Sequence, residues 1–171
     1  SEGDGIEINK REAVRYYKLA ADQGHLNSMI YFAFMNYQGD GIEANKKEAA
    51  RYYKLAADQG HVDSMYNYAI MLEIGDGIEG SKAEAFRYYK LAADRGHVDS
   101  MYNCAVMLDN GDGIETNKKE AARCYKLAAD KGNVYSIYNY ANMLFKGDVI
   151  EANKKEAARY YKLAADQGNT D

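Results

Sequence analysis

Three histidines are the side chains of this sequence best suited to bind a metal ion. His25, His61 and His97 occupy the same place in successive copies of a repeated segment, each 36 residues after the last. Zinc ligands must converge to about 2 Å from the metal, and residues in the separate loops of stacked repeats lie too far apart for that. We therefore interpret the histidines as residues that pack the loops, and we predict no metal site and no cofactor.

Two cysteines are the strongest candidates for thiol chemistry. Cys104 and Cys124 each stand where other copies of the repeat have an aromatic residue. The helices that should carry them pack together, so one interpretation is a disulfide, but spacing alone does not establish the Cβ approach that a disulfide needs. We favour a pair of free buried thiols, in a repeat that two large-to-small changes make slightly looser.

The acids and hydroxyl groups form no recognisable catalytic arrangement. Each Gly-Asp-Gly turn offers a single acid and lacks the alternating oxygen ligands of a calcium loop. No Ser/His/Asp set, phosphate-binding loop or cleft of paired carboxylates can be identified. We therefore predict that the chain has no catalytic residues and is not an enzyme.

Composition restricts the classes of partner. The 171 residues carry a net charge of −4. This argues against nucleic-acid binding driven by an overall positive charge of the protein. No run approaches the ~20 apolar residues of a membrane span, so we expect no membrane insertion. Two cysteines make no disulfide framework, which is typical of a reducing compartment, and we expect a cytoplasmic location.

A strict repeat must position all of these residues. The phrase EAARYYKLAADQGH at Glu48 has copies that begin at Glu12, Glu84, Glu120 and Glu156. A second phrase, DSMYNYAIMLEIGDGIEG at Asp63, has copies that begin at Asn27, Asp99 and Tyr135. Every interval is 36 residues without insertion, so one structural unit is repeated throughout the chain.

Each phrase predicts a helix. In the copy at Glu48, the residues Ala49, Tyr53 and Ala56 recur with the period of one helix face. Asn45 and Glu48 form the pattern of a capping box, and the glycine that ends the phrase suits the left-handed position after a helix. The second phrase should begin at an Asp or Asn cap and end at the Gly-Asp-Gly turn. The same box recurs as Asn9 and Glu12, Ser81 and Glu84, Asn117 and Glu120, and Asn153 and Glu156.

Neither helix could bury its apolar face alone, so the helices must pack on their neighbours. We predict an all-α fold, a single α/α superhelical solenoid of helix-turn-helix repeats over residues 1–171. An unpaired helix of about 10–23 comes first, followed by pairs of about 25–60, 61–96, 97–132 and 133–168. In the last pair Val149 replaces the second glycine of the turn, and because valine takes a positive φ only at a cost, we expect a distorted loop there.

The two phrases resemble the Sel1-like repeat. The order Ser-Met-Tyr-Asn-Tyr-Ala from Ser64, then Gly-Asp-Gly-Ile, then Lys-Lys-Glu-Ala-Ala-Arg-Tyr-Tyr-Lys-Leu-Ala-Ala-Asp-Gln-Gly is similar to that family's motif over nearly all of the chain. The family is related to the tetratricopeptide repeat and has a longer loop between its two helices. The resemblance implies that the second-phrase helices line the concave side of a superhelix.

Comparison of the copies with one another separates two kinds of surface. The first-phrase helices repeat the same charged rows, represented by Arg51, Lys54 and Asp58. Such rows are normally solvated, and each exposed Lys–Asp pair at a spacing of four stabilises the helix by only about 0.3–0.5 kcal/mol. We therefore interpret the charged rows as a solvated outer face.

The second-phrase helices have a core side that hardly changes, with Ser64, Tyr68, Met71 and Leu72, and a far side that varies. A face turned to water should be polar, yet the far side is aromatic or branched, so it is a candidate binding surface. The predicted partner-binding residues of this concave face are Ile30, Phe34, Tyr37, Tyr66, Asn67, Ile70, Glu73, Tyr102, Asn103, Val106, Asp109, Tyr138, Asn139, Asn142 and Phe145.

Structural explanations compete for part of this surface. The tyrosine column that contains Tyr66 could equally be a ladder between neighbouring repeats. The asparagine column that contains Asn67 could hold a peptide backbone or make a buried structural hydrogen bond. Phe34, Tyr37 and Phe145 break the pattern of their columns, and for these we favour contact with a ligand.

The sequence therefore predicts a non-catalytic scaffold or adaptor whose concave groove binds a peptide or a partner helix. The expected partners are proteins or peptides. An alternative is a repeat segment that serves as the regulatory or assembly region of a larger multidomain enzyme, since the sequence begins inside a repeat loop. End-to-end self-association through the apolar face of the first helix, around Ala13 and Tyr17, is a third interpretation.

Overall fold

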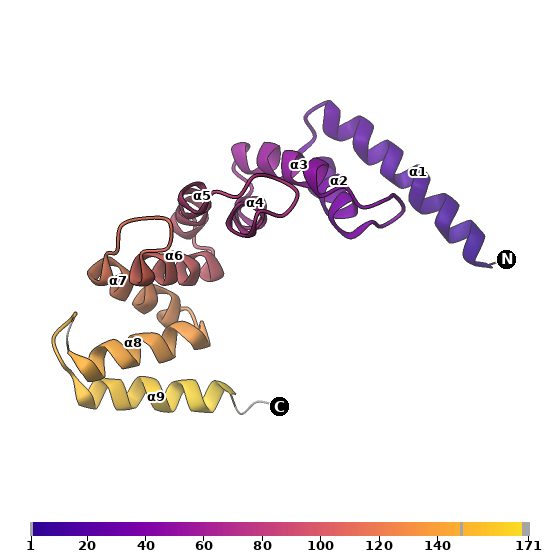
Figure 1. The fold of residues 1–171 in the computed structure, drawn as a ribbon. Coiled ribbons are helices and arrows are strands. Elements are labelled where there is room, and N and C mark those ends of the chain that lie inside the picture. Colours follow the sequence, from indigo (N-terminus) through magenta and orange to yellow (C-terminus); the bar gives the residue numbers. More distant parts are fainter. Residues whose placement is uncertain (1, 148, 169–171) are drawn as a thin grey trace. The chain divides into compact units, whose positions relative to one another are not determined.

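The computed structural model describes residues 2–147 and 149–168, and over these residues the chain forms helices without strands (Figure 1). The helices are α1 (Glu2–Asp22), α2 (Leu26–Gln38), α3 (Lys46–Asp58), α4 (Val62–Ile74), α5 (Lys82–Asp94), α6 (Val98–Asn110), α7 (Lys118–Asp130), α8 (Val134–Lys146) and α9 (Lys154–Gly168). The even-numbered helices come from the second phrase and are called the inner helices; the odd-numbered helices are called the outer helices. The predicted all-α class is confirmed.

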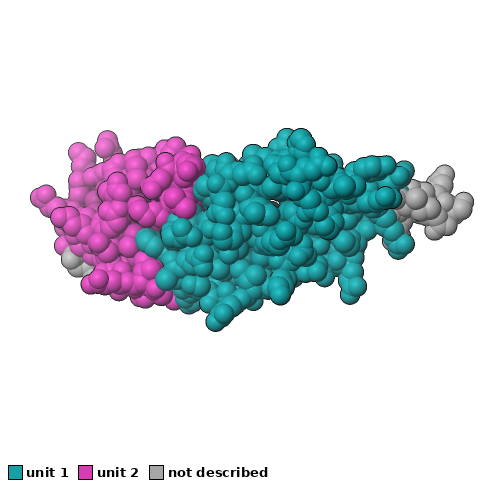
Figure 2. Space-filling view, turned by 90° about the horizontal axis from the view of Figure 1, so that it is seen from above, with its two compact units in different colours: residues 1–88 teal, residues 89–171 magenta. Residues whose placement is uncertain are grey.

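The chain divides into two compact units, residues 1–88 and residues 89–171 (Figure 2). Unit 1 contains α1 to α4 and the first half of α5, and unit 2 contains the rest of α5 and α6 to α9. In unit 1, α2 packs between α1 and α3, and α4 packs on α3. In unit 2, α8 packs between α7 and α9, and α6 packs on α7. Inner and outer helices therefore alternate within each unit.

The outer helices after α1 begin at the caps that the sequence predicts, but only half of the capping box forms. The Asn45 side chain accepts a hydrogen bond from the backbone N–H of Glu48 at 3.0 Å. The N–H of Asn45 donates instead to the carbonyl of Asn36 at 2.8 Å, and the Glu48 carboxylate pairs with Arg51. The cap therefore starts an outer helix and also fastens it to the inner helix before it. The backbone N–H groups of Ser81, Asn117 and Asn153 make the corresponding bonds.

The inner helices begin one or two residues before the predicted Asp or Asn caps. Their N-caps are His25, His61, His97 and Asn133. The rings of His61 and His97 accept a hydrogen bond from the N–H three residues further on, at 3.1 and 3.2 Å. Asp63 lies in the first turn, where its charge suits the positive end of the helix. The predicted caps are wrong because the capping acceptor stands two residues earlier, an imidazole nitrogen in α4 and α6 and the Asn133 side-chain oxygen in α8, while His25 makes no side-chain cap.

The first helix also differs from the prediction. α1 begins at Glu2 and not near residue 10, so Asn9 lies inside the helix and makes no N-cap. In the second repeat pair, the Gly-Asp-Gly stretch is held as a loop because Met71 O accepts from the N–H groups of Gly75 and Asp76. The first Gly-Asp-Gly, at residues 3–5, instead lies within α1.

The outer helices bury two of their sides. In α3 the predicted stripe of Ala49, Tyr53 and Ala56 is buried, and so are Tyr52 and its neighbour Ala50 on the adjacent side. Small residues let this helix approach the inner helices on both sides, which explains the many alanines. The predicted core side of the inner helices is confirmed by α4, which buries Ser64, Tyr68, Met71 and Leu72.

In unit 1 the Gly-Asp-Gly loops run close to the outer helix that precedes their repeat pair. Gly77 has a φ of +78°, and a Cβ added there would lie 2.5 Å from the Cβ of Lys46. Glycine is therefore required both by conformation and by space. In the last loop Gly147 keeps a positive φ but Val149 does not. Among the described residues only glycines have a positive φ, which agrees with the steric cost of that conformation for valine. The loop thus differs at Val149 as predicted, while Asp148 lies outside the described residues.

Candidate binding site on the inner helices

The predicted site residues lie on the inner helices, and none of them is buried in the core. We call the side of the inner helices that carries these fifteen residues the inner-helix face. Phe34 in unit 1 and Tyr138 and Phe145 in unit 2 are exposed, and the other predicted residues are half-buried. The inner-helix face therefore keeps apolar rings in contact with solvent in both units.

A pocket of about 190 Å³ opens between α2 and α4 in unit 1. Phe34, which is 48% exposed, belongs to its lining. The amide of Asn67 gives this mostly apolar lining a hydrogen-bond donor and acceptor. The full lining is Phe34, Tyr37, Gln38, Tyr53, Asn67, Ile70 and Met71. Four predicted site residues thus converge on one pocket.

The other predicted site residues of unit 1 do not line this pocket and are half-buried. Ile30, Tyr66 and Glu73 each keep part of their surface exposed. Tyr31, which stands in the asparagine column, packs its ring on Tyr17 of α1 with centroids 5.2 Å apart. The first repeat therefore has an aromatic contact where the later repeats have an amide.

In unit 2 the face is dominated by a cluster of tyrosine rings. The ring of Tyr102 on α6 lies 6.2 Å from that of Tyr125 on α7 and 5.7 Å from that of Tyr135 on α8. Tyr135 is 69% exposed and was missed by the sequence analysis. The signal was present, because Tyr135 replaces the polar Asn or Asp of its column. Tyr102 is half-buried and makes a packing contact between the two inner helices α6 and α8.

Two predicted asparagines of unit 2 have structural partners. A side-chain hydrogen bond from Asn139 reaches the buried Tyr125, and Asn142 accepts one from the hydroxyl of Tyr161 at 2.6 Å. The ring of Tyr161 also lies 5.9 Å from that of Tyr138. Asn139 is half-buried and makes a hydrogen bond within the fold, as the structural interpretation of the asparagine column expects. The predicted residues Asn103 and Val106 are half-buried on the same face.

Aromatic residues at the end of two inner helices interact with a lysine of the next outer helix. Lys46 Nζ lies 5.1 Å from the ring centre of Tyr37 in unit 1, and Lys154 Nζ lies 5.7 Å from that of Phe145 in unit 2. Both distances fall in the range of cation–π attraction. Phe145 is nevertheless 53% exposed, so the lysine leaves much of its ring accessible.

The outer helices carry the predicted charged rows. Lys18–Asp22, Lys54–Asp58 and Lys126–Asp130 pair at 2.7–2.8 Å, and Lys90–Asp94 at 3.8 Å. The hydrogen bond from Lys18, together with one from the hydroxyl of Tyr52, lowers the pKa of Asp22. These pairs are exposed, so each contributes little to stability.

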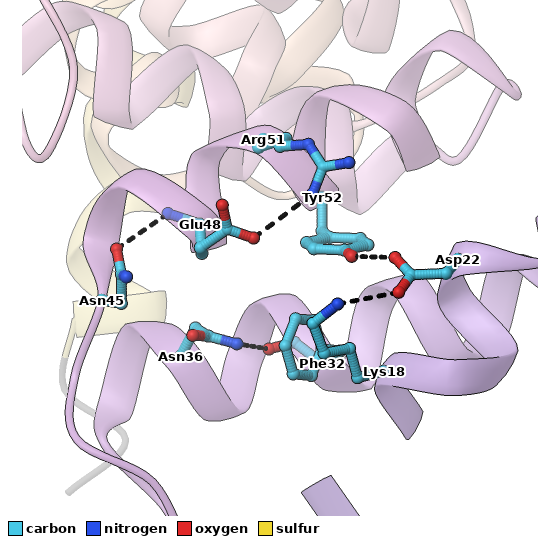
Figure 3. A network of polar contacts seen from close by, with 8 residues as sticks. All are labelled: Lys18, Asp22, Phe32, Asn36, Asn45, Glu48, Arg51 and Tyr52. Carbon is cyan, nitrogen blue, oxygen red and sulfur yellow. Dashed lines mark hydrogen bonds and ion pairs between the residues drawn. The ribbon is translucent and has the colours of Figure 1, made fainter. Parts of the chain in front are cut away.

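The bond from Tyr52 to Asp22 joins α3 to α1 and was not predicted (Figure 3). Tyr88 donates to Asp58 in the same way at 3.2 Å, and Tyr160 to Asp130 at 3.3 Å. The series is interrupted in the third repeat pair, where Cys124 takes the place of the tyrosine. A hydrogen bond from a tyrosine to an aspartate of the preceding outer helix thus recurs along the outer helices, except at Cys124, which has no hydroxyl group.

The cysteines are free thiols in an apolar setting. Cys104 is buried and Cys124 is half-buried. Burial raises the pKa of Cys104 to about 12 and also raises that of Cys124. Thiols that stay protonated are poor nucleophiles and poor metal ligands. The described residues contain no group of three or more His, Cys, Asp or Glu side chains that could hold a metal ion.

The larger cavities lie on the outer helices and are lined by charged side chains. One of about 760 Å³ in unit 1 is bordered by Arg11, Arg15, Lys18 and Glu48. One of about 390 Å³ in unit 2 is bordered by Lys119, Glu120, Arg123 and Lys126. Arg123 pairs with Glu120 at 2.6 Å in the unit 2 wall, and in the unit 1 wall Lys18 pairs with Asp22 and Glu48 with Arg51. Because these charges already have partners, the smaller apolar pocket is the better candidate for a binding site. Within the described part of the chain, no helix is long and apolar enough to cross a membrane.

Comparison with known structures shows several relatives. The uropathogenic Escherichia coli protein c5321, a protective antigen displaying an SLR fold, is 26% identical over 94% of this chain with a TM-score of 0.90. A Sel1 repeat protein from Oxalobacter formigenes is 24% identical over 93% of the chain with a TM-score of 0.80. The chain spans 34% of the first protein's length and 65% of the second's.

A more distant similarity is to Helicobacter pylori cysteine rich protein B, 18% identical over 77% of this chain and 94% of that one, with a TM-score of 0.58. No curated protein sequence matches the chain. The profile of the Sel1 repeat matches residues 1–25, 27–61, 62–97, 98–133 and 134–169. These five matches cover almost the whole sequence, so the chain belongs to the Sel1 repeat family.

Proposed function

We propose that this chain is a non-catalytic scaffold that binds a peptide or a helix of a partner protein through the inner-helix face. Sel1 repeat proteins generally serve as scaffolds for protein interactions. The observation that carries the proposal for this chain is the pocket of about 190 Å³ between α2 and α4, with the half-exposed ring of Phe34 in its lining. Apolar surface that a folded protein leaves exposed often marks an interaction site.

The size of the pocket suits one apolar anchor. A cavity of about 150 Å³ holds a benzene-sized ligand, so this one accepts a side chain such as leucine or phenylalanine. Burial of such a side chain stabilises a complex by about 1.5–3 kcal/mol, before the cost of association is subtracted. The amides of Asn67 and Gln38 in the lining can bond to the backbone of the bound segment. An anchor plus a hydrogen-bonded backbone is a common mode of peptide recognition.

The chemistry of the side chains supports a binding role over a catalytic one. Catalysis by a thiol needs an accessible thiolate, whereas Cys104 is buried and its pKa is raised. His61 and His97 use their Nδ1 atoms to cap inner helices. Cys104, His61 and His97 are therefore buried or engaged in structural contacts, and the Sel1 repeat fold is typically non-catalytic.

The test measures the affinity of peptides selected from a random display library on the folded chain. Phe34→Ala and Ile70→Ala should each weaken binding of peptides that use the unit 1 pocket by about fivefold or more. The matched control is Leu55→Ala, which removes a 37% exposed apolar side chain from outer helix α3 and should leave the affinity unchanged. Circular dichroism checks that all three variants remain helical. Equal affinity of the parent and both inner-helix variants, for every selected peptide, rules out this pocket as a binding site.

A further inference from the structure

The exposed aromatic rings of unit 2 are concentrated on one inner helix. Among the described residues of this unit, the exposed rings are those of Tyr135, Tyr138 and Phe145, and all three belong to α8. The half-buried Asn142 stands between Tyr138 and Phe145 in the same helix. We call these four residues the α8 ridge.

Packing within the fold does not account for these rings. The copies of Tyr135 in the other inner helices are Asn or Asp, and two of the three copies of Phe145 are acids. Inner helices therefore form with polar residues at both positions. Tyr138 meets the ring of Tyr161 on α9 edge to face, with centroids 5.9 Å apart, yet it stays 54% exposed. Rings that a folded helix leaves in water are available to a ligand.

The spacing of the rings along α8 is set by helix geometry. Tyr138 and Phe145 are seven residues apart, which is nearly two full turns, so they lie on the same side of the helix and about 10 Å apart along its axis. Asn142 lies one turn after Tyr138 on that side, and Tyr135 lies about one turn before it. The ridge thus presents two aligned rings with an amide between them.

The polar groups of the α8 ridge are mainly free donors. The oxygen of the Asn142 amide accepts a hydrogen bond from the hydroxyl of Tyr161 at 2.6 Å, which leaves both N–H groups of that amide for a ligand. The hydroxyls of Tyr135 and Tyr138 have no hydrogen-bond partner among the described residues. A ligand that matches the ridge therefore brings apolar rings and hydrogen-bond acceptors.

A proline-rich segment has this combination. Proline supplies an apolar ring and has no backbone N–H, and the carbonyls of a polyproline II helix make no internal hydrogen bonds. This helix repeats every three residues, or about 9 Å, which is close to the spacing of Tyr138 and Phe145. A bound α-helix uses its carbonyls internally, and an ordinary extended segment brings N–H groups that need acceptors.

We infer that the α8 ridge binds a proline-rich segment in the polyproline II conformation. Two prolines three residues apart lie on the rings of Tyr138 and Phe145, and a backbone carbonyl between them accepts a hydrogen bond from Asn142. The preformed polyproline II helix loses little entropy on binding to such aromatic surfaces. This inference rests on the proposed function and adds the chemical class of the partner segment to it.

The experiment compares two display libraries selected on the intact chain. One library has a fixed Pro-x-x-Pro core, and the other has an Ala-x-x-Ala core with the same randomised positions. The proline library should yield the tighter binders. Fluorescence polarisation then measures selected peptides as labelled synthetic decamers, and replacement of both prolines by alanine should weaken binding about fivefold or more.

Variants of the chain locate the binding site. Tyr138→Ala and Phe145→Ala should each weaken the selected proline peptides about fivefold or more. Asn142→Asp keeps an oxygen that can accept from Tyr161 but removes the free N–H donors, and it should weaken them about three- to tenfold.

The matched control is Leu127→Ala, which removes a 42% exposed side chain from outer helix α7 of the same unit. It should leave the affinity unchanged. Circular dichroism and urea unfolding check that every variant folds as the parent does.

The outcomes distinguish this inference from the proposed function. Proline peptides that bind Tyr138→Ala and Phe145→Ala as tightly as the parent overturn the inference. So do Tyr138-dependent binders that come only from the alanine library, or oligosaccharides that bind at Tyr138 when proline peptides do not. In each case peptides that depend on Phe34 or Ile70 in unit 1 leave the proposed function standing. Libraries that yield no peptide sensitive to any inner-helix variant overturn both.

Discussion

The third repeat pair contains a packing difference whose energetic effect can be calculated and measured. In unit 1 the rings of Phe32 and Tyr52 meet edge to face at 4.8 Å, and those of Tyr68 and Tyr88 do so at 4.8 Å. Tyr140 and Tyr160 form the same contact in unit 2 at 5.1 Å. The equivalent positions of the third pair hold Cys104 and Cys124. The double substitution Cys104→Tyr with Cys124→Tyr should restore the ring pair.

The magnitude follows from the burial of the corresponding rings. Tyr68 is 8% exposed and Tyr88 is 2% exposed, so nearly all of each added ring would leave water. Full burial of a large apolar side chain is worth about 1.5–3 kcal/mol, part of which the cysteine already supplies, and the edge-to-face contact adds about 0.5–1.5 kcal/mol. We expect the double variant to raise the free energy of unfolding by about 2–4 kcal/mol. Each single variant should gain less than half of that, because its ring lacks the partner.

The assay is urea unfolding followed by circular dichroism and by tyrosine fluorescence, which the absence of tryptophan leaves unobscured. A double-mutant cycle then gives the coupling between the two positions, expected at about 0.5–1.5 kcal/mol. Hydrogen exchange should show slower opening of α6 and α7, because these helices carry the substituted positions. A double variant that is no more stable than the parent, or that gains without coupling, refutes this reasoning, since the helices would then have closed around the thiols.

Other positions allow matched comparisons of single residues. Gly77→Ala should lower the free energy of unfolding by more than about 2 kcal/mol, because Gly77 has a positive φ and an added Cβ would lie 2.5 Å from the Cβ of Lys46. Gly60 also has a positive φ but faces open space, so Gly60→Ala should cost about 1 kcal/mol in the same urea assay. Ser64→Ala removes a buried hydroxyl that is hydrogen-bonded to His61 at 2.9 Å, and it should lower the free energy of unfolding by about 1–2 kcal/mol. Ser136→Ala removes a buried hydroxyl that has no hydrogen-bond partner, and it should leave the free energy of unfolding unchanged within error. Cys104, with a pKa raised to about 12, should resist thiol reagents at pH 8 until the protein unfolds. The thiol of the unfolded chain ionises near pH ~8.5, so the contribution of buried Cys104 to stability should be complete below that pH. It should decline as the pH rises from there towards about 12, which urea titrations across this range would show.

Much of the fold could be predicted because helical periodicity is a local property. The alternation of small and aromatic residues in the first phrase was sufficient to predict the buried stripe through Ala49 and Ala56, and the predicted core side of α4 was correct. The bond from Tyr52 to Asp22 spans 30 residues and depends on how one outer helix is offset against the next. Periodicity within a helix carries no information on that offset, although the joint recurrence of the tyrosine and the aspartate in the copies was a usable signal.

Errors arose where a residue performed an uncommon role. His61 caps an inner helix although histidine is rarely considered for that position, and α1 begins at Glu2, so that the first Gly-Asp-Gly lies within a helix. The candidate face was predicted from variation between copies, which correctly indicated that Phe34 and Phe145 are exposed. Variation could not separate binding from packing at Asn139, whose partner Tyr125 lies on another helix. The exposed Tyr135 was missed because its column is otherwise polar.

The most direct measurement of the central claim is a footprint of a bound peptide on the intact chain by hydrogen exchange and backbone NMR shifts. We predict that a peptide selected on the folded protein slows exchange in the inner helices and shifts the resonances of Phe34, Asn67 and Ile70 in unit 1, or of Tyr102, Tyr135 and Asp109 in unit 2. The charged rows of the outer helices, represented by Arg51 and Lys54, should not respond. Protection confined to those outer rows, with the inner helices unchanged, would contradict the account.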